Sequence, residues 1–267
     1  MIDAATVADL ADRLHEAERT RTPMRQLSLE HPDMTVDDAY AVQRAWVERK
    51  LAEGRRLIGH KVGLTSTVMQ QSLGIDEPDH GALLDDMRFD DGADVPFDRF
   101  IKPRIEIELA FVLDRDLRGE DCTAEDALAA TAYVTPAMEI LDARVQMSDP
   151  ETGHLRTIVD TVSDNAADAG VVLGDLRIKP DEIDLRWVPG LLVQNGTIVE
   201  SGVSAAVLDH PANAVAWLAN RLGSLGVTLE AGQVVLAGSF IRAVPVAKGD
   251  MLRADYGGIG SIGCTFA

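Results

Sequence analysis

The segment Arg104–Leu113, RIEIELAFVL, has the residue pattern that most restricts how this chain can fold. Successive side chains of a β-strand point to opposite faces, so Glu106 and Glu108 would share one face and the apolar residues around them the other. Two neighbouring carboxylates repel each other in a partly buried position unless water, a cation or a metal compensates. The pattern leaves two interpretations open: a solvated outer face of an edge strand, or one side of a site for a hard divalent ion with oxygen ligands.

A third carboxylate, Glu139, lies in the segment PAMEILDARV. In a strand it would face away from its apolar neighbours, and an isolated buried Glu needs a partner. One interpretation makes Glu139 a third metal ligand that completes a set with Glu106 and Glu108 and leaves positions open for substrate and water. The other makes it half of an internal salt bridge with Arg144 or another basic residue.

The segment GHKVGLT, residues 59–65, places Lys61 between two glycines. Glycines let the backbone bend closely around a ligand. A lysine in a concave site holds a carboxylate, or moves a proton if its pKa is lowered. The alternative is a solvated loop lysine with no such role.

Two further segments carry donors that suit an anion. DTVSDNAADAG, residues 160–170, contains Ser163 and Asn165, and AGSF, residues 237–240, places Ser239 at the end of an expected strand. Hydroxyl, amide and backbone N–H groups there are able to bind an anion. The same residues are also typical of turns and helix caps.

The remaining chain divides into a helical start and a β-rich body. Apolar spacings of three and four predict a helix that ends before Pro23, and Thr35 with Asp38 predicts a capping box that starts a second helix. From about Leu57, short apolar runs alternate with Gly, Asp and Pro, as in α+β proteins. We expect an N-terminal helical region over residues 1–56 and a β-rich catalytic core over 57–267, with integration into one domain as the alternative. Asn195-Gly196 predicts a hairpin turn.

Composition excludes several classes of function. The net charge is -19, which would repel nucleic acid and anionic membrane surfaces, so an anionic substrate needs a local cation or metal. No apolar run approaches the roughly 18 to 20 residues of a spanning helix. The start of the chain has helical spacing and not a signal-peptide pattern, and we expect a cytoplasmic protein. The sequence contains no dinucleotide, phosphate-loop, serine-hydrolase or histidine metal motif.

Taken in order, GHKVGLTS, EPDHGALLDDM, PRIEIELAFVL, AMEILDARV, DTVSDNAADAGVVLG, HPANAVAWLAN and AGSF resemble the hydratase and decarboxylase branch of the fumarylacetoacetase-like family. The resemblance covers nearly the whole chain. It implies an α+β fold with a mixed β-roll or sandwich core and an N-terminal helical layer. It also implies Mg²⁺ or Mn²⁺ bound by Glu106, Glu108 and Glu139.

The resemblance further implies a metal-dependent hydratase, that is, a hydro-lyase acting on a small 2-oxo dicarboxylate, in a homo-oligomer. Lys61 and Asp79 would be acid, base or orienting groups, and the candidate contacts to the substrate carboxylate are Ser163, Asn165 and Ser239. Decarboxylation is the alternative activity, and a non-catalytic partner subunit is the alternative class. One departure from the family pattern is His80, where close relatives commonly have Tyr.

Overall fold

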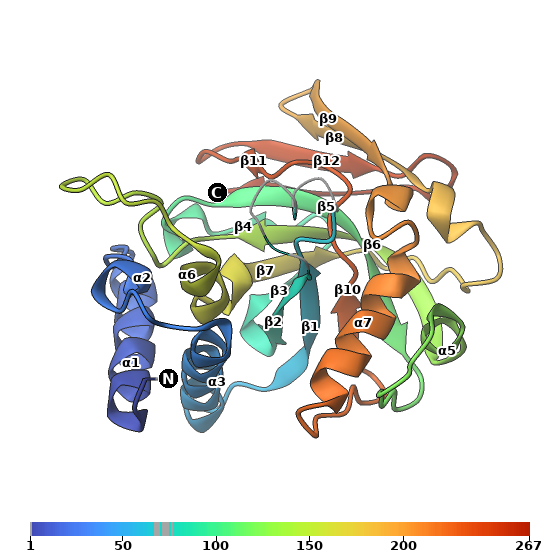
Figure 1. Cartoon of the computed structure of the whole chain (residues 1–267). Coiled ribbons are helices and arrows are strands. Elements are labelled where there is room, and N and C mark those ends of the chain that lie inside the picture. Colours follow the sequence, from blue (N-terminus) through green and yellow to red (C-terminus); the bar gives the residue numbers. More distant parts are fainter. Residues whose placement is uncertain (1, 67–69, 71–74, 76) are drawn as a thin grey trace.

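Helices form a layer beside the sheets in the computed structural model, which describes residues 2–66, 70, 75 and 77–267 (Figure 1). The layer contains α1 (Ala4–Thr20), α2 (Leu27–Glu30) and α3 (Val36–Ala52). The predicted capping box is confirmed, because Thr35 accepts from the Asp38 N–H and the Asp38 carboxylate accepts from the Thr35 N–H. None of the helices in the described part of the chain is long and apolar enough to cross a membrane.

The larger sheet has the strand order β2-β1-β10-β5-β6-β7-β3, and β11 pairs with the far end of β5. Most neighbours are antiparallel, whereas β1 with β10 and β3 with β7 are parallel, so the sheet is mixed as expected. Its strands are β1 (Leu57–Gly63), β2 (Asp79–Leu84), β3 (Arg88–Asp90), β5 (Arg104–Leu113), β6 (Thr131–Leu141), β7 (Asp168–Leu173), β10 (Val234–Leu236) and β11 (Val244–Pro245).

The second sheet has the order β4-β13-β12-β8-β9 and lies beyond β5 in Figure 1. The predicted hairpin is confirmed, since Asn195 and Gly196 both have positive φ between β8 and β9. A buried apolar cluster joins the sheets, and the Tyr256 hydroxyl donates to the Ala137 carbonyl across it at 2.6 Å. The strands are β4 (Asp94–Val95), β8 (Pro189–Gln194), β9 (Thr197–Val203), β12 (Met251–Asp255) and β13 (Ser261–Phe266); the later helices are α5 (Ala124–Ala129), α6 (Ile158–Ser163) and α7 (Pro211–Gly223).

Strand β5 lies inside the larger sheet, so the edge-strand interpretation of RIEIELAFVL is wrong. It pairs with β6 along its whole length and with β10 on its other side. Its apolar residues are buried, and Glu108, on the opposite face, is only 1% exposed. The two glutamates of this strand therefore lie over the interior of a sheet, where water cannot freely compensate their charge.

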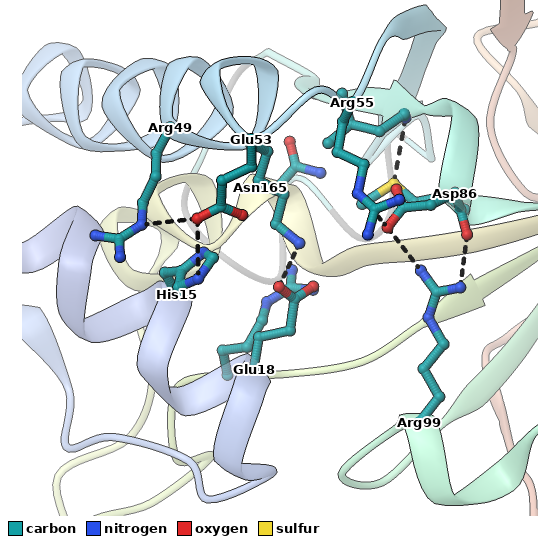
Figure 2. Close-up of polar contacts among 12 residues, drawn as sticks. His15, Glu18, Arg49, Glu53, Arg55, Asp86, Arg99 and Asn165 are labelled. Carbon is teal, nitrogen blue, oxygen red and sulfur yellow. Dashed lines mark hydrogen bonds and ion pairs between the residues drawn. The ribbon is translucent and has the colours of Figure 1, made fainter.

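The helical layer shares its contacts with the β-rich body. Leu84 and Met87 belong to the same apolar cluster as residues of α1 and α3. Figure 2 shows two groups of ion pairs here: Arg55 and Arg99 both approach Asp86, at 3.3 and 3.5 Å, and a second group ties α1 to α3. The boundary between residues 56 and 57 stays a prediction, and these contacts favour one integrated domain.

A buried ion pair fixes the turn that leads into β7. Arg144 and Asp164 are 1% and 2% exposed, and the Arg144 Nε and backbone N–H both donate to the Asp164 carboxylate. The guanidinium also donates to the Asp168 carbonyl at 3.1 and 3.0 Å. Asp164 is thus the carboxylate partner of Arg144, and a salt bridge between Arg144 and Glu139 is excluded as an interpretation.

Replacing Arg144→Met should leave the Asp164 carboxylate buried without its cation. We expect the free energy of unfolding to fall by about 3 to 5 kcal/mol, because breaking a buried pair strands the other charge. Urea denaturation of the metal-free protein measures this loss. The matched control is Arg253→Met, which breaks an exposed pair with Asp255 and should cost about 1 kcal/mol or less. Equal losses for the two variants would contradict this role of Arg144.

Candidate functional site

Three carboxylates from two neighbouring strands converge on one face of the larger sheet. Glu106 and Glu108 are two residues apart on β5, and the antiparallel register places Glu139 of β6 directly opposite Glu106. One oxygen from each of the three lies within 4.8 Å of the others. Such a set of oxygen ligands suits a hard divalent cation.

The hydrogen bonding of the three carboxylates shows that they fit a cation. Glu108 Oε2 accepts from the Gly238 N–H at 2.8 Å, but Glu108 Oε1 and both oxygens of Glu139 are buried with no hydrogen-bond partner among the described residues. A buried carboxylate oxygen without a donor is costly. A divalent cation held between the three residues would compensate these oxygens together.

Burial and mutual repulsion make the cluster basic. Burial raises the pKa of Glu106 to about 8, with Glu139 adding to the shift, and raises the pKa of Glu108 well above its usual range. Without a cation the cluster therefore retains protons near neutral pH.

Lys61 and Asp79 lie beside this cluster on β1 and β2. Lys61 Nζ is 3.5 Å from Glu139 Oε1 and 3.9 Å from Asp79 Oδ1, and the Lys61 and Asp79 side chains are each only 4% exposed. Glu139 therefore does have a basic neighbour, Lys61, as well as the geometry of a metal ligand.

The pKa of Lys61 shifts in the opposite direction to that required of a proton-accepting lysine. Burial alone would lower the pKa, but the Glu139 and Asp79 carboxylates outweigh it and raise the pKa of Lys61. Lys61 is therefore a permanent cation here. For Asp79, burial raises the pKa of the carboxyl against the opposing effect of Lys61, which keeps a proton accessible to this group.

The two glycines around Lys61 make room for the protein and not for a ligand. A Cβ on Gly63 would lie 2.2 Å from Asp79 Oδ1 and 2.8 Å from Lys61 Nζ. A Cβ on Gly59 would lie 1.9 Å from the Val234 carbonyl oxygen of the neighbouring strand. Gly63 thus permits the close approach of Lys61 and Asp79, and Gly59 permits strand pairing.

The three candidate substrate contacts differ in what their side chains do. The Asn165 amide accepts from the Ala82 N–H at 2.8 Å and donates to the Ala82 carbonyl at 3.0 Å, which ties it to β2. Ser239 Oγ donates to the Ile241 carbonyl at 3.0 Å, close to the end of β10. Ser163 Oγ is buried with no hydrogen-bond partner among the described residues, so its donor is available.

Asp168 is a site residue that the sequence did not reveal. It is fully buried, neither carboxylate oxygen has a hydrogen-bond partner among the described residues, and burial with repulsion from Glu139 raises the pKa well above its usual range. The residues before it, Asn165–Ala167, all have positive φ. A turn of this kind is strained and is found at functional sites, but only Asn165 hints at it in the sequence.

His80 faces away from the acidic cluster. Alternation along β2 sends it to the face opposite Asp79, where its ring stacks on Tyr40 at 4.5 Å between centroids. Burial lowers the pKa of His80 to about 3, so its ring is neutral. The departure from Tyr at this position therefore affects packing against α3 and not the charge around Asp79.

Comparison with known proteins places this site in a family. A model of the fumarylacetoacetate hydrolase C-terminal family matches residues 85–267. The chain is 59% identical to 2-oxo-hept-4-ene-1,7-dioate hydratase of Escherichia coli over all of both chains. It is 42% identical to a 2-keto-4-pentenoate hydratase of Paraburkholderia xenovorans, over 97% of this chain and 94% of that one.

A solved structure extends the similarity to the three-dimensional level. The 4-oxalocrotonate decarboxylase of Pseudomonas putida, complexed with magnesium and adipate, superimposes with a TM-score of 0.94 at 34% identity, covering 100% of this chain and 99% of that one. The same decarboxylase is also known with calcium and acetate. The expected fold is thereby confirmed, and the chain belongs to the fumarylacetoacetate hydrolase C-terminal family.

Proposed function

We propose that the protein is a divalent-metal-dependent hydratase that converts 2-oxo-hept-4-ene-1,7-dioate into 4-hydroxy-2-oxoheptanedioate in 4-hydroxyphenylacetate degradation. The observation that carries the proposal is the group of three buried carboxylates with unpartnered oxygens beside the Lys61 and Asp79 pair. The full-length similarity to a hydratase of that substrate supports the choice of reaction.

Glu106, Glu108 and Glu139 would hold the cation, and Mg²⁺ or Mn²⁺ is proposed because all three ligands are carboxylate oxygens. When bound, the cation supplies Lewis-acid stabilisation of the negative charge that develops on the 2-oxo acid. Lys61 remains protonated between Glu139 and Asp79, so it contributes a fixed positive charge and N–H donors to the same region.

Asp79 is the group we assign to proton transfer. The reaction removes a proton from C3 and adds one at C5, which moves the double bond into conjugation with the ketone. Water then adds at C4, and C3 is reprotonated. Burial keeps a proton accessible to Asp79 near neutral pH, and Lys61 holds the carboxyl in place. Ser163 and Ser239 are proposed to donate to the substrate carboxylate, and Asn165 to position β2 beneath it.

The proposal extends to a homo-oligomer in the cytoplasm. Apolar side chains are exposed on the second sheet and its connection, where a second copy would cover them. The exposed fractions are 58% for Trp187, 60% for Ile198 and 61% for Met251. Exposed apolar groups of this size mark interaction surfaces.

A spectroscopic assay tests the proposed reaction. Purified protein is mixed with the dienoate, with EDTA or with added Mg²⁺, while ultraviolet absorbance is followed and the product is identified by mass. Metal-dependent loss of absorbance with gain of one water supports the hydratase. Loss of carbon dioxide would instead support decarboxylation, as in the structurally similar decarboxylase. No turnover by the metal-loaded chain would favour a partner subunit.

Glu106→Gln should weaken metal binding while preserving the fold, because the amide is nearly isosteric but lacks the charge. We expect kcat/KM at limiting Mg²⁺ to fall by about 100-fold or more, since the metal supplies several kcal/mol of charge stabilisation. Calorimetric titration with Mg²⁺ gives the affinity independently. Glu200→Gln, at a glutamate of β9 that pairs with Arg242, is the control. Wild-type affinity and turnover in Glu106→Gln would contradict the assignment.

The pH dependence of stability reports the same cluster in the metal-free protein. The pKa of Glu106 is raised in the folded state, so its stabilising effect is fully present below the ordinary value of 4.5 and is lost as pH rises through about 8. We expect the urea midpoint of EDTA-treated protein to fall over this window, and to fall less in Glu106→Gln. Added Mg²⁺ should remove most of the dependence. An identical profile for the variant would show that Glu106 does not titrate in this way.

A further inference from the structure

Arg156 is a basic residue near the site whose donors are not fully used. It directly precedes Thr157, the N-cap of α6, and its backbone N–H donates to the Met147 carbonyl at 2.9 Å. The same loop is pinned to the helical layer, because Arg25 Nε donates to the buried Asp149 carboxylate at 2.5 Å. The backbone that carries Arg156 is therefore held in place by the fold.

The Arg156 guanidinium has capacity to bind an anion. Its Nη1 is buried with no hydrogen-bond partner, and no carboxylate of the described residues lies within 4 Å of it. The carboxyls whose charge it senses most, Asp164, Asp160 and Asp79, are each committed elsewhere. Asp164 pairs with Arg144, Asp160 accepts from Ser28 and Thr157, and Asp79 faces Lys61.

The position of Arg156 relative to the cluster follows from its effect on Asp79. Burial raises the pKa of Asp79, whereas Lys61 and Arg156 both act to lower it. Lys61 Nζ lies between Glu139 and Asp79, at 3.5 and 3.9 Å. The order of charged groups is therefore the carboxylate cluster, Lys61, Asp79 and then Arg156.

A dicarboxylate needs a cation at each end in a protein of net charge -19. If the 2-oxo end of the substrate lies at the carboxylate cluster, the other carboxylate extends past Lys61 and Asp79. Lys61 is already balanced by its two carboxylate neighbours. Arg156 has the planar donor pair that binds a carboxylate bidentately.

We propose that Arg156 binds the distal carboxylate of the substrate and so makes the enzyme selective for dicarboxylates over monocarboxylates. The inference rests on the proposed function, and it assigns to one residue the choice between a seven-carbon diacid and a shorter monoacid.

The test compares Arg156→Gln with wild type on two substrates: 2-oxo-hept-4-ene-1,7-dioate and 2-hydroxypenta-2,4-dienoate, which lacks the distal carboxylate. We expect kcat/KM for the diacid to fall by about 10- to 100-fold, mainly through KM, because a charge-assisted contact is lost. Turnover of the monoacid should be unchanged, and Arg156→Lys should recover part of the diacid activity. Arg221→Gln is the control, since Arg221 is a partly buried arginine of α7 that lies near Asp37.

Equal losses on both substrates would overturn the proposal and give Arg156 a structural role, and an unchanged ratio would overturn it as well. If wild type turns over neither compound, the proposed function fails. Thermal stabilisation of the Mg²⁺-loaded protein by 2-oxoadipate relative to 2-oxobutyrate then still tests Arg156. A preference for the diacid that disappears in Arg156→Gln supports its role, and a preference that persists contradicts it.

Discussion

The electrostatic cost of burying Glu106, Glu108 and Glu139 together is the constraint on which the site depends. Three carboxylates within 4.8 Å of one another, shielded from water by a sheet and helices, repel each other strongly. The described chain provides one hydrogen bond from Gly238 and one nearby cation, Lys61. Protons or a divalent cation must supply the remainder, so the fold itself creates a demand for metal.

The surrounding scaffold holds these charges in a fixed arrangement. The pairing of β5 with β6 sets Glu106 opposite Glu139, and Gly63 leaves room for Lys61 and Asp79 to meet. On the other side, the strained turn Asn165–Ala167 is held by the Asn165 amide on β2 and by the buried Arg144 ion pair. Strain is tolerated there because contacts from several elements determine the backbone.

Local patterns predicted more of the fold than of the site. Capping residues and alternation identified the helices, the hairpin and the shared face of Glu106 and Glu108, because these depend on neighbours along the chain. The position of β5 inside the sheet and the register that brings Glu139 to Glu106 depend on distant segments, so they came only from the structure or the family resemblance. Asp168 and Arg156 had no local signal, since their roles follow from burial and from partners elsewhere in the chain.

Anomalous diffraction from crystals soaked in Mn²⁺ tests the central claim most directly, because it locates the cation without relying on activity. The account predicts one strong anomalous peak within bonding distance of carboxylate oxygens of Glu106, Glu108 and Glu139, on the side of the sheet that carries Lys61. A peak that lacks any of the three glutamates, or manganese bound only at surface carboxylates, would contradict it.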